Sequence, residues 1–316
     1  RQMCIRDRNI SMDEPYAAIC GISEDEIRLQ MKDDLGELAK KLEITPEEAL
    51  MKLKENYDGY HFTSPSPDIY NPFSLLNAFA DGKFGSYWFG SGTPTYLIKM
   101  LNKFGVKPSE IGCKQLKSSA FDAPTETMTD AVPLLYQSGY ITIKDYNKML
   151  DLYTLDIPNK EVRLGLMESL LPYYVNNKTP EATTMVAYLF YDIQNGDMDA
   201  ALHRLQEFLS TIPYCDNTRF EGHYQQVFYI IFSLLGYYVD VEVRTPRGRV
   251  DIVLRTKTTL YVMELKLDKS AGEAMEQIDL KNYPERFALC GLPVVKVAVS
   301  FDSERCTIGD WKIIGC

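Results

Sequence analysis

The order of secondary structure expected after Thr218 constrains the fold of this chain most. A helix is expected over TRFEGHYQQVFYIIFSLLG, closed by Gly236, because apolar residues recur there at helical spacing. Three strands are expected next, YYVDVEVR, GRVDIVLR and TLYVMELKL, followed by the helix SAGEAMEQIDLKNYPERF and a final strand, PVVKVAVSFD. A helix between two strands of one sheet is a crossover connection, so this α-β-β-β-α-β order predicts an α/β fold with a mixed sheet.

Two carboxylates are expected to face each other across the second and third strands. If the turn between them is centred between Lys257 and Thr258, Asp251 lies directly opposite Glu264. The preceding TPRG has the Pro and Gly positions of a type I turn, and a tight turn there places Glu242 opposite Asp251. The sequence therefore predicts a row of three carboxylates across three strands.

Carboxylates opposed in this way need a compensating positive charge, because like charges directly opposite each other destabilise a sheet. Mg²⁺, or Mn²⁺ in its place, is the preferred explanation, since a hard divalent cation binds one or two carboxylates together with waters and substrate phosphates. Lys266 shares a face with Glu264 and can orient a water or neutralise charge on a phosphate. The alternative is a solvated strand face with an ion pair, and for Glu242 an exposed strand residue.

The segment GRVDIVLRTKTTLYVMELKL, with the helices before and after it, resembles the PD-(D/E)xK nuclease superfamily over about residues 219–301. The resemblance implies a restriction-endonuclease-like domain at 217–316 that cleaves nucleic acid, expected to be DNA. It implies Asp251 and Glu264 as ligands of Mg²⁺ or Mn²⁺ and Lys266 as the catalytic lysine. Val250 stands where the family usually has a proline.

Two further site residues come from the helices on either side. The first helix of the superfamily often contributes a Glu, and Glu221 occupies that place, although Thr218-x-x-Glu221 is equally a capping box. Gln277 lies on the helix after the Glu-x-Lys strand, where the superfamily often has a polar residue near the site. Ser270-x-x-Glu273 is expected to cap that helix, and Gln277 can equally be a solvated residue.

Residues 9–101 resemble the end of an AAA-ATPase-like domain found before such nucleases. The motifs that carry this resemblance are NISMDEPYAAICGISEDEI, YDGYHF, YNPFSLLNAF and YWFGSGTPTYLIKML. No GxxxxGK[ST] phosphate loop occurs in the chain, so ATP is expected to bind only through an N-terminal half that is missing here. The first eight residues, RQMCIRDR, resemble translated sequencing adapter, and native sequence is expected to begin near Asn9.

The region between these two parts, 102–216, is expected to be helical. Helix, strand, turn and strand near residues 130–175 are compatible with a winged-helix-like unit, and the domain boundary is expected near Asp216 or somewhat before Asn176. The sequence thus predicts a leader (1–8), an AAA-ATPase-like end (9–101), this region, and the nuclease domain.

Composition excludes a broad basic surface. The formal net charge is −10, but residues 219–316 carry 13 Lys plus Arg and 13 Asp plus Glu, so nucleic-acid contact is expected at the C-terminal end. Seven scattered cysteines indicate reduced thiols, and no apolar run is long enough to span a membrane, so a cytoplasmic protein without a membrane partner is expected. A rival hypothesis is a non-catalytic module of an ATPase that binds nucleic acid or a partner.

Overall fold

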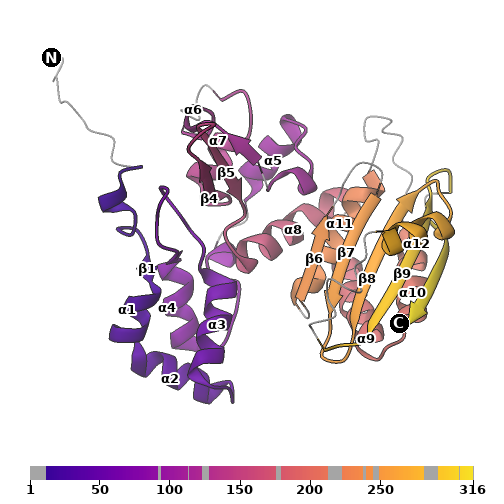
Figure 1. The fold of residues 1–316 in the computed structure, drawn as a ribbon, viewed down its shortest axis with the longest axis horizontal. Coiled ribbons are helices and arrows are strands. Elements are labelled where there is room, and N and C mark those ends of the chain that lie inside the picture. Colours follow the sequence, from indigo (N-terminus) through magenta and orange to yellow (C-terminus); the bar gives the residue numbers. More distant parts are fainter. Residues whose placement is uncertain are drawn as a thin grey trace. The chain divides into compact units, whose positions relative to one another are not determined.

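The computed structural model describes residues 12–91, 94–112, 114–122, 128–175, 179–212, 223–237, 240–244, 249–280, 291–305 and 307–315. The chain divides into two compact units, Arg1–Leu166 and Met167–Cys316, and Figure 1 labels most of their helices and strands. The four segments expected from the sequence stay a prediction. None of the helices in the described ranges is long and apolar enough to cross a membrane.

The first unit opens with a run of helices, and those that precede residue 82 share one apolar core. These elements, with a small two-stranded sheet and two 3₁₀ turns, are η1 (Glu14–Tyr16), β1 (Ile22–Ser23), α1 (Glu24–Gln30), α2 (Lys32–Lys41), α3 (Pro46–Tyr57), β2 (Ile69–Tyr70), α4 (Pro72–Asp81), η2 (Phe89–Ser91) and α5 (Thr95–Lys103). The start of α3 is well capped, because Thr45 is its N-cap, Pro46 its first residue and Glu48 closes a capping box with Thr45. Leu38, Leu53 and Tyr57 are fully buried in this core.

A three-stranded antiparallel sheet completes the first unit. Its elements are η3 (Pro108–Glu110), β3 (Lys114–Leu116), α6 (Ser118–Phe121), α7 (Val132–Gln137), β4 (Thr142–Asn147), β5 (Leu152–Asp156) and the start of α8 (Lys160–Tyr174). The strands lie in the order β3-β5-β4. Helix, two strands and helix follow one another as expected, and a winged-helix-like identity stays a prediction.

The second unit is a mixed five-stranded sheet with helices on both faces. After the rest of α8 it contains α9 (Thr179–Gln194), α10 (Met198–Ser210), α11 (His223–Leu234), η5 (Leu235–Tyr237), β6 (Asp240–Arg244), β7 (Arg249–Arg255), β8 (Leu260–Leu267), α12 (Ala271–Leu280), β9 (Val294–Asp302) and β10 (Thr307–Gly315). The strand order is β10-β9-β8-β7-β6. Only β8 and β9 are parallel among these pairs, because α12 connects them as a crossover. The expected mixed sheet is confirmed.

Side-chain alternation along β8 and β9 assigns each helix to a face of the sheet. On one face, Val262 and Ala298 pack against α12, and Lys296 of β9 forms an ion pair with Asp279 of α12 at 2.8 Å. On the other face, the Phe228 ring of α11 meets the Phe301 ring of β9 edge-on, with centroids 5.5 Å apart. Figure 1 shows α12 beside β8 and β9.

Helices α9 and α10 lie on the face that α11 covers. The Tyr261 hydroxyl of β8 donates to the Ile193 carbonyl of α9 at 3.4 Å, and the Trp311 indole of β10 donates to Asp199 of α10 at 2.8 Å. These helices, which precede residue 217, therefore complete the core beneath the sheet.

The expectation that PVVKVAVSFD is the final strand is wrong, because β10 follows it and pairs antiparallel with β9. β10 is an edge strand, and after Ile308 it buries no residue. Its sequence therefore lacks the buried apolar alternation from which a strand can be recognised. From α11 to β10, the order of the described helices and strands is therefore α-β-β-β-α-β-β.

Candidate functional site

The β7–β8 hairpin closes with the turn that the sequence predicts. The Thr256 amide donates to the Thr259 carbonyl at 2.9 Å, and the Thr256 hydroxyl accepts from the Thr259 amide at 3.0 Å. These bonds centre the four-residue turn between Lys257 and Thr258. The register that follows pairs Asp251 with Glu264, as predicted.

This carboxylate pair is buried. Asp251 is 8% exposed and Glu264 is 1% exposed, and Asp251 Oδ1 and Glu264 Oε1 are both buried atoms. Directly opposed residues share a sheet face with Cβ atoms about 4.5–5.5 Å apart. The hairpin therefore brings two acidic groups from positions far apart in the sequence into one shielded location.

Lys266 lies beside the pair, two residues after Glu264 and on the same face of β8. It is only 7% exposed, and its Nζ donates to the Glu273 carbonyl of α12 at 3.3 Å. The contact directs the ammonium toward the α12 side of the sheet, where Glu264 also points. A cation and two carboxylates thus lie on one face of the sheet.

The start of α12 is fixed by the expected cap. The Ser270 amide donates to the Glu273 carboxylate at 3.3 Å, and the Glu273 amide donates to the Ser270 hydroxyl at 3.2 Å. Gln277 lies one helical turn after Glu273, and its Oε1 is buried without a hydrogen-bond partner in the part of the chain that the structure describes. The amide oxygen of Gln277 is thus shielded from solvent.

The expectation that Glu242 lies opposite Asp251 is wrong, because β6 pairs with β7 two residues out of the predicted register. Glu242 pairs with Val253, and Arg244 takes the place opposite Asp251. Arg244–Asp251 is the last pair between β6 and β7, so the connection between these strands is longer than the tight TPRG turn that the prediction assumed. A two-residue shift keeps each residue on its face. The predicted third carboxylate is thus replaced by a cation, which sequence reasoning missed.

The remaining predicted site residue, Glu221, lies outside the described residues, as does the capping box proposed for it. Nearby, His223 begins α11, and its ring stacks on Tyr174 with centroids 5.4 Å apart. Burial lowers the pKa of His223, which favours the neutral ring. His223 therefore has a packing role.

The donor set suits a hard divalent cation held by two protein carboxylates. No group of three or more His, Cys, Asp or Glu residues that could hold a metal ion occurs among the described residues. A site with one or two carboxylates, completed by waters and substrate phosphates, is the usual arrangement for Mg²⁺. The buried oxygens of Asp251 and Glu264 fit this arrangement. They do not fit a site in which protein side chains supply every ligand of the metal.

A comparison with protein families matches residues 219–311 to the PD-(D/E)XK nuclease superfamily. Residues 219–311 form a PD-(D/E)XK nuclease superfamily domain. This domain begins before α11 and ends within β10, so it contains β6 to β9, the first part of β10 and the Asp251–Glu264 pair. Helices α9 and α10 precede the matched segment and pack against its sheet.

A longer protein of Azotobacter chroococcum mcd 1, named "Uncharacterized protein in vnfD 5'region", is 30% identical over 317 residues. The similarity covers 95% of this chain and 58% of the relative, so the chain spans little more than half of that protein's length. No solved structure matches the chain.

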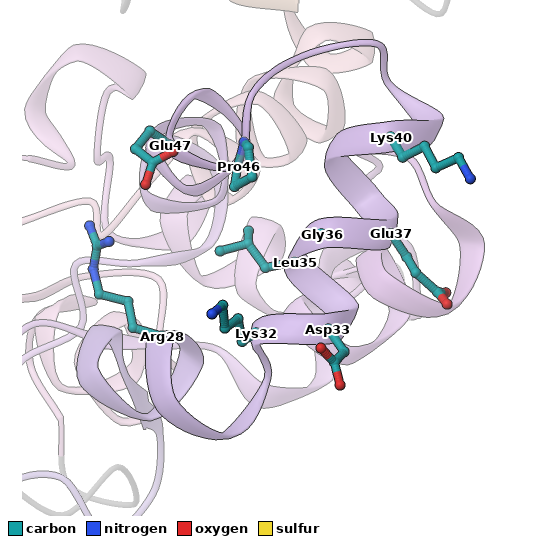
Figure 2. A pocket seen from close by; sticks show the side chains of 9 residues that line it. All are labelled: Arg28, Lys32, Asp33, Leu35, Gly36, Glu37, Lys40, Pro46 and Glu47. Carbon is teal, nitrogen blue, oxygen red and sulfur yellow. The ribbon is translucent and has the colours of Figure 1, made fainter.

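The first unit contains a groove of about 710 Å³ between α1, α2 and the start of α3. Figure 2 shows Leu35 pointing toward Pro46, whereas Glu37 and Lys40 extend away from it. Charges of both signs line the groove: Arg28, Lys32, Asp33, Glu37, Lys40 and Glu47. This balance favours neither an anionic nor a cationic ligand.

The YDGYHF segment follows α3 and carries a buried acid. Asp58 is 2% exposed, and both of its carboxylate oxygens are buried. Burial, reinforced by the nearby Asp68, raises the pKa of Asp58 to about 6, while a backbone hydrogen bond from Gly59 and the Lys54 ammonium, 3.8 Å from Asp58 Oδ2, partly offset this effect. Tyr57 and Tyr60 are buried, so packing of the aromatic side chains accounts for much of this motif.

Proposed function

We propose that the chain is a divalent-metal-dependent nuclease that hydrolyses phosphodiester bonds of nucleic acid, with DNA as the expected substrate. The observation that carries the proposal is the direct pairing of two buried carboxylates, Asp251 and Glu264, with Lys266 on the same face. Opposed carboxylates destabilise a sheet unless a cation compensates, so a function that uses the cation explains why this arrangement is present. Superfamily membership of the domain supports the same conclusion.

Asp251 and Glu264 would hold Mg²⁺ or Mn²⁺ through their carboxylate oxygens. When bound, such an ion supplies a more acidic water and neutralises charge on the phosphate and leaving oxygen. Lys266 would orient the attacking water or stabilise the negative charge that develops on the phosphate oxygens. Gln277, with a shielded amide oxygen near the turn of α12 that contacts Lys266, would position that water or the ammonium, and Glu221 would add a carboxylate from the segment before α11.

Cleavage of supercoiled plasmid, linear duplex and single-stranded RNA by the purified chain tests the proposal. DNA should be nicked or degraded with Mg²⁺ or Mn²⁺ and left intact with EDTA. Asp251→Asn, Glu264→Gln and Lys266→Met should each lower cleavage at least 100-fold, because each removes a group at the reacting centre.

Two exposed neighbours serve as matched controls. Glu276→Gln removes a carboxylate from α12, and Lys269→Met removes an ammonium just after β8. Both should retain cleavage and the wild-type melting temperature. Equal activity in the control and site variants would overturn the assignment of the site, and DNA binding without cleavage under any divalent ion would favour the non-catalytic module.

For residues 9–101 we propose the end of an AAA-ATPase-like domain, supported by the aromatic motifs of the sequence. The similarity covers only 58% of the relative, which is compatible with a larger protein of this kind. Extending the reading frame upstream tests the proposal. A GxxxxGK[ST] before residue 9 would support it, and an upstream region without any phosphate loop would contradict it.

A further inference from the structure

One row of side chains crosses the nuclease sheet at the level of the carboxylate pair. Strand pairing places these residues side by side in the row: Arg244, Asp251, Glu264, Ala298 and Lys312. Directly paired residues point to the same face of a sheet. Arg244 is therefore the neighbour of Asp251 on the side away from Glu264.

The two ends of this row differ in access. Ala298 is fully buried because α12 packs over the β8–β9 half of the face. Arg244 is exposed on β6, at the other end of the row. A ligand that approaches Asp251 along this face from the β6 side therefore passes the Arg244 side chain.

The negative charge around the carboxylate pair is a reason for an anionic substrate to need the positive charge of Arg244. Two buried carboxylates repel a phosphodiester, and the chain as a whole carries a net charge of −10. Lys266 donates to the Glu273 carbonyl and so points toward α12, away from the exposed end of the row. A guanidinium presents two parallel N–H groups to phosphate oxygens, which an ammonium cannot do.

We propose that Arg244 binds a non-bridging phosphate oxygen of the nucleic-acid backbone and holds the phosphodiester beside the Asp251–Glu264 pair. The inference rests on the proposed nuclease function and adds a substrate-binding residue to it. Arg244 contacts a phosphate that every nucleotide carries, so its contribution is independent of base sequence.

The decisive variant is Arg244→Gln, with Arg255→Gln as the matched control. Arg255 is also exposed and on the same face of β7 as Asp251, but four residues along the strand, about 13 Å away. Arg244→Gln should weaken binding of a short fluorescein-labelled DNA duplex in EDTA about tenfold and reduce the salt dependence of log Kd, between about 50 and 200 mM NaCl, by about 0.9. Arg255→Gln should leave cleavage at the wild-type rate.

Arg244→Lys separates the shape of the side chain from its charge. It should restore the salt dependence but only part of the affinity, because the ammonium keeps the charge and loses the paired N–H groups. In cleavage assays Arg244→Gln should raise KM more than it lowers kcat, as expected when a contact is present before the chemical step.

A purely structural role, in which Arg244 only balances the charge of Asp251, makes a different prediction. The Asp251→Asn background removes that charge and also prevents cleavage, so DNA binding can be measured without turnover. If Arg244 contacts phosphate, Arg244→Gln still weakens binding about tenfold in this background. If it only balances Asp251, the loss disappears, and the proposal is overturned.

Different experimental results would reject the role of Arg244 and the nuclease function. Cleavage by the wild type with unchanged binding by Arg244→Gln rejects the role of Arg244 alone. Absence of cleavage by the wild type, with binding that depends on Arg244, rejects the nuclease function alone. Absence of DNA binding by the Asp251→Asn chain rejects the phosphate contact, whatever the wild type cleaves.

Discussion

Asp251 of β7 lies directly opposite Glu264 of β8, and both carboxylates are buried on the face of the sheet that α12 covers in part. The hairpin turn sets this pairing, because hydrogen bonds between Thr256 and Thr259 fix the register of the two strands. Two carboxylates opposed in this way repel each other and favour a cation beside them.

Glu264→Gln should stabilise the chain in EDTA and abolish its stabilisation by Mn²⁺. Removing one of two opposed charges relieves about 0.2–1 kcal/mol. The wild type should instead gain about 2.7 kcal/mol when Mn²⁺ is present at about 100 times its Kd, because only the folded state binds the ion. Urea unfolding followed by Trp311 fluorescence in a Trp88→Phe background reports on the second unit alone, since the chain has two tryptophans. Equal Mn²⁺ stabilisation in variant and wild type would contradict the shared site.

Lys266→Met should separate catalysis from metal binding. The variant keeps the length of the side chain and both carboxylates, so Mn²⁺ should still raise the urea midpoint, while plasmid cleavage falls at least 100-fold. Its melting temperature in EDTA should fall, because the variant removes the buried ammonium from the face that the two buried carboxylates share. Loss of Mn²⁺ stabilisation together with cleavage would show that Lys266 shapes the metal site instead.

Gln277→Met tests whether the shielded amide acts in the reaction. The Oε1 atom is buried without a hydrogen-bond partner among the described residues, so an apolar side chain of similar length should leave stability unchanged or raise it by about 1 kcal/mol. Cleavage should nevertheless fall about tenfold or more if the amide positions a water or Lys266. Wild-type cleavage by Gln277→Met would make Gln277 a packing residue of α12.

The buried Asp58 should make the first unit more stable in mild acid. Its pKa in the folded chain is about 6, above the ordinary value of 3.8, so folding takes up a proton between these values. The resulting stabilisation is fully present below about pH 3.8 and is lost as the pH rises through about 6. Asp58→Asn stays neutral throughout, so relative to the wild type it should gain about 2 kcal/mol between about pH 4 and pH 7.

Trp88 fluorescence in a Trp311→Phe background measures this difference in the first unit. Asp25→Asn, which removes an exposed carboxylate of α1, is the control and should not reproduce the gain expected of Asp58→Asn. A constant difference between Asp58→Asn and the wild type across this pH range would show that the folded chain does not hold a proton on Asp58.

The sequence predicts the parts of the site that short-range geometry determines. The turn Thr256–Thr259 is symmetric between two apolar strands, so its centre and the Asp251–Glu264 pairing follow from the pattern. The β6–β7 connection is different, because a Pro and a Gly permit a tight turn but do not require one. Strand alternation does not reveal the pairing of Arg244 with Asp251, because a shift of the register by two residues keeps each side chain on its face.

The sequence does not predict the edge strand β10, for a related physical reason. Trp311 packs against α10 through its indole hydrogen bond, whereas Ile313 and Ile314 are 37% and 47% exposed. An edge strand with little burial has no alternating pattern of apolar residues. Its pairing with β9 is a tertiary effect that a single sequence does not record.

The central claim is that Asp251 and Glu264 bind one divalent ion together. X-ray diffraction from a crystal soaked in Mn²⁺, measured at the manganese absorption edge, tests this claim most directly. The account predicts one anomalous peak between the two side chains, with an oxygen of each carboxylate at roughly the 2.0–2.1 Å of a hard-cation bond, and no such peak in Glu264→Gln. A Mn²⁺ ion bound by one carboxylate alone, or no peak in the wild type while Arg244 or Lys266 pairs with the two acids, would contradict it.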